Sequence, residues 1–398
     1  MDVIISTDQR YDGTPDGAVW SPTNGAYPFW LRYLEVFDNV RVMARVRPVS
    51  SVPSNWQRVD GERISVVPIP YYIGPVQYLL KALQVQQAVS KGANLNDAII
   101  LRVPSNVANC IEYWLRHTGH PYGLEVVADS YNFFAPGSVK HPLRPFFRRW
   151  FTNRLQKQCA QASAVSFVTK EALQRRYPPG EKTYSTFYSD VELSNEAFVS
   201  SPRLPHPDSD KFTLITVASM DHSSKAIDVL IDAVAICVKQ KLNLELILVG
   251  DGKYRGELEA QTAKLGIKER VFFRGKLPAG KAVFEQLDKA DVFVLASRQE
   301  GLPRAIIEAM TRGLPCIGSN VGGIPELLTA EDLVQPGDAV VLAAKIQEVI
   351  TVPERMIHMS TRNLEAAKQY KDDFLRERRL EFYHYVKQTT EAWLKINN

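Results

Sequence analysis

Apolar and polar residues alternate in regular blocks through the second half of the chain. Short apolar runs of strand length cover residues 212–218, 244–249, 271–273, 292–296 and 315–319. Helical spacing of apolar residues marks the segments between them, at 227–239, up to 265, 281–287, 305–312 and from 339 onward. Strands that alternate with helices and are bounded by glycines predict a parallel, doubly wound sheet.

The first half of the chain shows the same alternation less regularly. Runs that fit strands cover residues 3–6, 40–46, 64–68, 98–103, 125–128, 164–169 and 183–186, and helical patterns cover 28–36, 77–91 and 106–117. Residues 200–208 then break all periodicity, with three prolines and two serines in nine positions. The pattern predicts one domain over residues 1–195, a second over 196–371, and a C-terminal helix at 372–398 that crosses back to the first.

Composition supports a folded cytoplasmic protein. Of the 398 residues, 45% are apolar and 23% are charged, which is far from disorder. No apolar run reaches the length of about 20 residues that a membrane-spanning helix needs, and the N-terminus lacks the basic region of a signal peptide. The formal charge of +4 lies wholly in residues 1–200, with 21 Lys and Arg against 17 Asp and Glu. This bias is too weak for a nucleic-acid binder, but it marks where an anionic partner would dock.

The candidate chemistry lies after the apolar run at 292–296. Residues 297–310 place Glu300 in a loop and Glu308 about two turns into the next helix. Ligands bind at the carboxyl ends of strands in open α/β sheets, and the N-terminus of a helix attracts a diphosphate there. Carboxylates hold sugar hydroxyls, and the diphosphate needs a cation, for which Lys225 in an earlier strand-to-helix loop is the candidate. Each residue alone also fits a solvated surface charge; their combination at strand ends favours a site.

These segments together resemble the donor motif of retaining glycosyltransferases of family four, which have the GT-B fold. The resemblance rests on Glu300 and Glu308 within SRQEGLP (297–303), IEAM (307–310), GLPCIGS (313–319) and VGGIPE (321–326). The segments ILVGDG (247–252) and FRG (273–275) and the Lys225 loop follow the order expected of that family. The match is strong over about residues 212–330 and weak over the first half.

The resemblance implies a fold of two Rossmann-like, doubly wound α/β domains facing a central cleft, with the donor held mainly by the second. By position, Glu300 would contact the donor sugar and Glu308 the ribose, while Lys225 would neutralise the leaving diphosphate. Further donor-binding positions would be Asn24, Gly25, Ser219, Arg274, Gly275, Lys276, Gly301, Leu302, Pro303 and Arg304. Such enzymes use a nucleotide sugar as co-substrate, need no metal or other cofactor, and favour front-face substitution without a protein nucleophile.

Three positions depart from the family pattern. Many members carry an arginine where this chain has Ser219, so Arg298 or Arg304 would have to supply the missing charge. Many also carry a histidine at the end of a first-domain strand. Here the stretch 125–130 has none, and Asp129 is the expected catalytic substitute. The glycine loop at Asn24–Gly25 has one glycine where two are common.

The sequence therefore predicts a retaining hexosyltransferase that uses a nucleotide sugar, with UDP-glucose first by family frequency, in polysaccharide or glycolipid synthesis. Two alternatives remain: a decayed GT-B scaffold protein and a nucleotide-sugar epimerase of similar architecture.

A basic and aromatic segment at 141–157, with five Lys or Arg, four aromatics and no acid, suits an anionic headgroup region. The same segment also fits a helix that packs its aromatic side chains on the protein core and exposes its arginines. On the first interpretation the protein sits peripherally at the inner face of a membrane and the acceptor is saccharide or lipid-linked.

Overall fold

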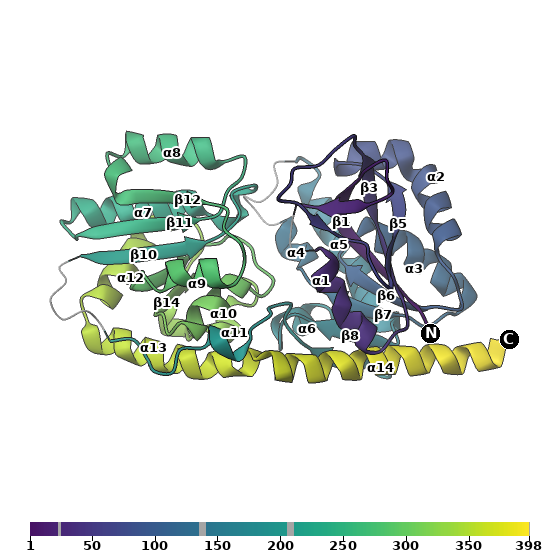
Figure 1. The fold of residues 1–398 in the computed structure, drawn as a ribbon. Helices are drawn as coiled ribbons and strands as arrows, with labels where there is room; N and C mark the ends of the chain where they lie inside the picture. The colour runs from purple at the N-terminus through teal and green to yellow at the C-terminus, as the bar shows by residue number, and fades with distance from the viewer. Residues whose placement is uncertain (23–24, 135–140, 205–210, 398) are drawn as a thin grey trace.

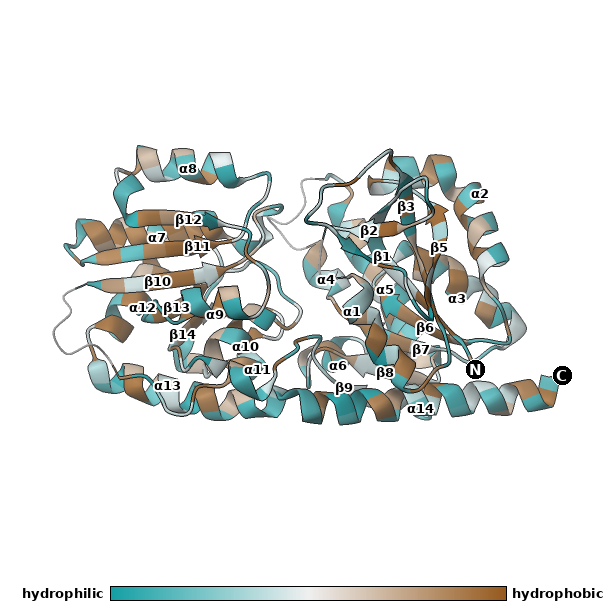
Figure 2. Ribbon diagram, in the orientation of Figure 1, coloured by the Kyte–Doolittle hydropathy of each residue, from teal (hydrophilic) through white to brown (hydrophobic). Residues whose placement is uncertain are grey.

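The computed structural model describes residues 1–22, 25–134, 141–204 and 211–397, and within these ranges the chain forms two sheets, each in its own α/β unit (Figure 1). Apolar strands fill the centre of both units, and polar residues lie mainly on their outer helices (Figure 2). The architecture is mixed α/β with two Rossmann-like units, as the sequence predicts.

The N-terminal sheet is nine-stranded. Its parallel strands run in the order β5-β3-β1-β6-β7-β8-β9, and the antiparallel pair β2 and β4 extends from the end of β1. The strands are β1 (Val3–Gly13), β2 (Val19–Ser21), β3 (Val40–Pro48), β4 (Gln57–Arg58), β5 (Ile64–Pro70), β6 (Ala98–Val103), β7 (Gly123–Val126), β8 (Ala164–Phe167) and β9 (Tyr184–Phe187). The helices are α1 (Tyr27–Trp30), α2 (Gly74–Gly92), α3 (Asn106–Thr118), α4 (Ser130–Phe133), α5 (Arg144–Gln161) and α6 (Ala172–Arg176).

The C-terminal sheet has the strand order β12-β11-β10-β13-β14-β15, with every pair parallel. Its strands are β10 (Phe212–Val217), β11 (Leu244–Val249), β12 (Val271–Gly275), β13 (Val292–Leu295), β14 (Cys316–Ser319) and β15 (Leu333–Val334). The helices are α7 (Ile227–Lys239), α8 (Arg255–Lys264), α9 (Lys281–Leu287), α10 (Arg304–Thr311), α11 (Ile324–Leu327), α12 (Ala339–Ile350), α13 (Pro353–Ala367) and α14 (Asp372–Asn397). The strand order reverses between β10 and β13, which is where such sheets bind ligands.

The first strand and the first helix are among the elements that differ from the sequence prediction. Strand β1 continues to Gly13 because, after an irregularity between Ser6 and Arg10, it resumes pairing with β3. The helix expected at 28–36 is the short α1 followed by a 3-10 helix over Leu31–Glu35.

Helix α14 is a single helix of 26 residues that follows α13 and runs along one edge of the N-terminal unit (Figure 1). It packs against β6, β8 and β9 and buries Phe382, Tyr383 and Val386 completely. A C-terminal segment therefore completes the core of the N-terminal domain.

Candidate functional site

A cleft separates the two domains at the carboxyl ends of their strands. One cavity of about 640 Å³ is lined from both sheets, by Gln9, Gly25, Arg102 and Asp190 on one side and by Ser219, Lys225, Arg304 and Glu308 on the other. A second cavity of about 680 Å³ shares Asp190, Arg304 and Glu308 with it, so the two cavities adjoin.

Lys225 and Glu300 form an ion pair at the edge of this cleft. The Lys225 Nζ donates to Glu300 Oε1 at 2.7 Å and to Oε2 at 2.9 Å. Ser297 Oγ donates to Oε1 at 2.6 Å. Glu300 is only 7% exposed, so these donors compensate a carboxylate that has lost most of its hydration. The cation and one of the carboxylates that the sequence singles out are therefore in direct contact.

Neighbouring contacts hold the two loops that carry this pair. Arg298 binds both carboxylate oxygens of Asp228, at 2.7 and 2.9 Å, and donates to the carbonyl of Ser223. These bonds pin the Lys225 loop to the loop that follows β13. They also occupy the Arg298 guanidinium, so of the two arginines considered as substitutes at the diphosphate, Arg304 is the one that lines the cleft.

A glycine pair explains the tight approach behind Glu300. A Cβ on Gly322 would lie 2.2 Å from the Glu300 carbonyl oxygen, and its φ of +55° is one that other residues rarely adopt. The Gly323 N–H donates to the Gly301 carbonyl at 2.7 Å. Gly322 and Gly323 therefore form the back support of the Glu300 loop.

Glu308 faces the cleft from the second turn of α10. Burial raises the pKa of its carboxyl, and Arg304 alone opposes this shift. Among the described residues, no donor hydrogen-bonds to the Glu308 carboxylate. A mostly buried carboxylate without a partner is costly for folding, which marks Glu308 as a ligand-binding group.

The other predicted donor residues fall into two groups. Gly25, Ser219, Lys276, Leu302, Pro303 and Arg304 line the cleft. The Gly25 carbonyl is fixed by the hydroxyl of Tyr11 at 2.8 Å, and Lys276 reaches across the domains to the carbonyl of Pro22 at 2.5 Å. Arg274, Gly275 and Gly301 do not line it; Arg274 lies over the ring of Phe272 instead. Asn24 lies outside the described residues.

Asp129 does not enter the cleft. Its carboxylate caps α4 by accepting the backbone N–H of Tyr131 at 2.9 Å and of Asn132, and it also accepts the Tyr177 hydroxyl at 2.6 Å and pairs with Arg176. With these four partners and only 2% exposure, the side chain has no free acceptor directed at a substrate. The assignment of Asp129 as a catalytic residue is therefore corrected to a helix-capping role.

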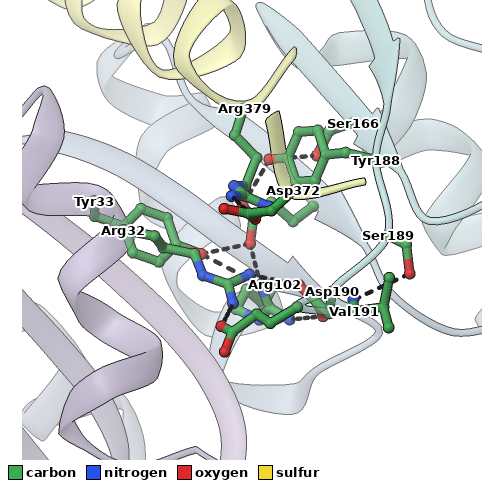
Figure 3. Close-up of polar contacts among 12 residues, drawn as sticks. Arg32, Tyr33, Arg102, Ser166, Tyr188, Ser189, Asp190, Val191, Asp372 and Arg379 are labelled. Atoms are coloured by element: carbon green, nitrogen blue, oxygen red, sulfur yellow. Dashed lines mark hydrogen bonds and ion pairs between the residues drawn. The ribbon is translucent and has the colours of Figure 1, made fainter. Parts of the chain in front are cut away.

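A buried polar network on the N-terminal side of the cleft was missed by sequence reasoning (Figure 3). Arg102 pairs with Glu125 and donates to Asp190 at 2.6 Å, while the hydroxyls of Tyr33 and Tyr188 donate to Glu125 at 2.7 and 2.8 Å. Burial by itself would raise the pKa of Asp190. The positive charges of Arg102 and Arg32 have a larger effect in the opposite direction, so the pKa of Asp190 is lowered. Asp190 is therefore held ionised in the cleft wall. The sequence did hold a signal for this network, since Arg102 and Glu125 are the charged residues of the otherwise apolar strands β6 and β7.

The domains also meet through Glu326 of α11. Its carboxylate accepts the backbone N–H groups of Lys170 and Glu171, at 2.6 and 3.0 Å, and of Ala172 at 2.5 Å. These contacts lie beside α6 and fix one edge of the interface.

No helix in the described part of the chain is long and apolar enough to cross a membrane.

The fold is that of the GT-B class. The structure superposes on Anabaena HepE, solved with UDP and glucose, with a TM-score of 0.66, 17% identity and coverage of 96% of this chain and 98% of that one. It superposes on sucrose-phosphate synthase of Thermosynechococcus elongatus with a TM-score of 0.69 at 17% identity, covering 98% of this chain and 99% of that one. At such identities the likeness establishes the fold.

The sequence comparisons match one family over part of the chain. Residues 202–366 match the family described as "Glycosyl transferases group 1". Protein CapJ of Staphylococcus aureus is 28% identical over 327 residues, or 82% of this chain and 81% of CapJ. The amylovoran biosynthesis glycosyltransferase AmsK of Erwinia amylovora is 33% identical over 140 residues, 33% of this chain and 34% of AmsK. Residues 202–366 therefore match the group 1 glycosyltransferase family that the motifs predict, and the whole chain has the GT-B fold.

Proposed function

We propose that the protein transfers a hexose, with retention of anomeric configuration, from a UDP-sugar to a saccharide or lipid-linked acceptor in polysaccharide or glycolipid synthesis. UDP-glucose is the first candidate donor. The observation that carries the proposal is the unpartnered, mostly buried Glu308 carboxylate in the same cleft as Lys225. The likeness to HepE, solved with UDP-glucose in one structure, and to AmsK supports the choice of donor and pathway.

The ion pair suggests how the site handles charge. Without donor, Lys225 and Glu300 neutralise each other at 2.7 Å. When a diphosphate arrives at the N-terminus of α10, the Lys225 ammonium moves to the phosphate oxygens and Glu300 becomes free to accept donor-sugar hydroxyls. Each buried charge then keeps a partner throughout, and the positive charge lies where negative charge grows as the nucleotide leaves.

The remaining roles follow from position. Glu308 accepts the ribose hydroxyls, Arg304 supplies the second positive charge at the diphosphate, and Lys276 borders the base. We propose that no metal takes part, since Lys225, Arg304 and the α10 backbone supply the positive potential. We also propose that the segment 141–157 brings the protein to an anionic membrane at the inner face.

A donor panel tests the proposal. The thermal midpoint is measured in EDTA with UDP, GDP and ADP and with their glucose, galactose, N-acetylglucosamine and mannose conjugates. Ligand at 100 times its dissociation constant adds about 2.7 kcal/mol of stability. We expect a rise with UDP-glucose that Glu308→Ala abolishes and the exposed-site control Glu377→Gln keeps.

Product analysis then separates the alternatives. Proton NMR of a reaction with an accepted glycan should show a new linkage with the donor's anomeric configuration. Conversion of the donor sugar to its epimer without acceptor would identify an epimerase. Absence of stabilisation by every nucleotide and conjugate of the panel would leave a decayed scaffold.

A further inference from the structure

Helix α2 carries an apolar stripe that faces away from the protein. Val76, Leu79, Leu80 and Leu83 are 68%, 71%, 81% and 75% exposed. Their spacing of three and four residues places them on one side of the helix, while Val85 and Val89, at 0% and 2%, face the core from the opposite side. A helix that is apolar on both sides is unusual at a water-exposed surface.

Helix α5 presents aromatic residues beside arginines. Phe147 and Phe151 pack inward against Phe134, with ring centroids 6.0 and 5.2 Å away. Phe146 and Trp150 point outward and are 61% and 45% exposed. Within the segment 141–157, two aromatics therefore pack on the protein and two face solvent.

The two helices cover the same face of the N-terminal sheet, with α3 between them (Figure 1). The Tyr78 hydroxyl of α2 contacts the Cys110 sulfur of α3 at 3.5 Å. Arg154 of α5 donates to the side chain of Asn109 on α3 at 2.8 Å. The outward side of α3 adds Tyr113, which is 67% exposed. The exposed apolar residues of α2, α3 and α5 thus belong to one surface, which we call the outer face.

Exposed charge on α2, α3 and α5 has a single sign, because the one acid of α3, Glu112, is 3% exposed and pairs with Arg116 and Arg154. The chain has no Asp or Glu between residues 63 and 96 or between 130 and 170. At the start of α5, Arg144, Arg148 and Arg149 line a cavity of about 290 Å³ together with Tyr131, Thr152 and Asn153. The Arg148 guanidinium stacks at 3.4 Å on the Tyr131 ring, so one wall of this cavity is fixed. An anionic group would meet arginines there and no carboxylate.

We propose that the outer face docks on a bilayer containing anionic lipid, with the α2 stripe buried among the acyl chains and the α5 arginines on the headgroup phosphates. Leucines and tryptophan beside arginine, without acids, are what an interfacial surface requires. A surface that binds a protein partner usually carries acidic as well as basic residues, and the exposed parts of α2 and α5 carry no acid. A second copy of the chain would place the arginines of one α5 against those of the other, and these like charges repel. The inference deepens the proposed contact of 141–157 by adding α2 as the inserting element, and it rests on the proposed function only for the membrane location.

Vesicle sedimentation tests the outer face directly. Full-length protein is mixed with vesicles of phosphatidylcholine alone or with 30% phosphatidylglycerol, a proportion on the order of natural anionic surfaces, at low and high salt. We expect binding to the anionic vesicles only, weakened by salt. Leu79→Ser with Leu80→Ser and Leu83→Ser should weaken binding at least about tenfold, because several buried CH₂ groups are lost. Arg149→Glu should weaken it about fivefold or more at low salt.

Matched controls make each outcome decisive. Val340→Ser with Val341→Ser removes exposed apolar residues of α12 in the other domain and should change nothing. The α2 variant should keep the wild-type thermal midpoint and UDP affinity, because its three leucines are exposed. Equal binding of wild type and α2 variant to anionic vesicles would overturn the proposal. So would a wild-type dimer that the α2 substitutions convert to a monomer, since that assigns the stripe to self-association. Vesicle binding without any nucleotide binding would sink the proposed function and leave this inference standing.

Discussion

Replacing Glu308 with glutamine is expected to stabilise the ligand-free protein while it weakens the donor complex. Glu308 lies in the cleft wall, and among the described residues its carboxylate receives no hydrogen bond. Burial raises its pKa against the single opposing charge of Arg304. An amide of the same shape removes the cost of burying that charge. Substitutions that remove an unfavourable group of this kind commonly raise the free energy of unfolding by about 0.5–2 kcal/mol. A change of about 1 kcal/mol moves the thermal midpoint of a domain of this size by about 2–4 °C.

The pH dependence follows from the direction of the shift. Because the folded-state pKa of Glu308 is raised, the folded protein holds this proton more tightly than the unfolded chain does. The stability contribution is present below the unfolded pKa and is lost as pH rises through the folded pKa. Glu308→Gln should therefore differ little from wild type near pH 4 and exceed it near pH 7.

The donor complex should respond in the opposite way. Hydrogen bonds to a charged group contribute about 1.5–3 kcal/mol, so the variant should bind UDP about 10- to 100-fold more weakly. At a UDP concentration 100 times the wild-type dissociation constant, the gain should fall from about 2.7 kcal/mol to about 0.4–1.4 kcal/mol. Scanning calorimetry with and without UDP at both pH values measures this, with Glu377→Gln as the exposed control. A Glu308→Gln variant with a lower ligand-free midpoint, or with an unchanged response to UDP, would refute the argument.

Three further substitutions probe the supports of the cleft. Lys225→Met should leave the Glu300 carboxylate without its cation and reduce kcat with UDP-glucose by about 100-fold or more; a KM effect alone would contradict the charge exchange. Gly322→Ala should cost about 1–3 kcal/mol, since its Cβ would lie 2.2 Å from the Glu300 carbonyl oxygen; urea unfolding measures this, and an unchanged midpoint would argue against the packing. Arg102→Met should cost about 3–5 kcal/mol, because it leaves Glu125 without a cation and Asp190 with Arg32 alone; calorimetry measures this, and a loss below about 1 kcal/mol would show that water replaces the guanidinium.

The sequence by itself determined most elements of the C-terminal domain and the strand ends that carry its candidate site. Apolar runs of strand length separated by helical spacing identify β10, β11, β13 and α7 because that periodicity is local. The carboxyl ends of parallel strands meet at one edge, so residues after β10 and β13 had to converge. Lys225 and Glu300, 75 positions apart in the chain, are accordingly in contact.

Only the tertiary structure decided which charged groups are free to act. Asp129 follows a first-domain strand, as a catalytic residue would, yet Tyr177 and Arg176 arrive from α6 and its end to saturate it. Arg298 and Arg304 look equivalent in the sequence, and the pairing of Arg298 with Asp228 leaves Arg304 for the cleft. Hydrogen-bond partners, burial and pKa shifts depend on side chains from distant segments, and the spacing of residues along one segment carries no record of them.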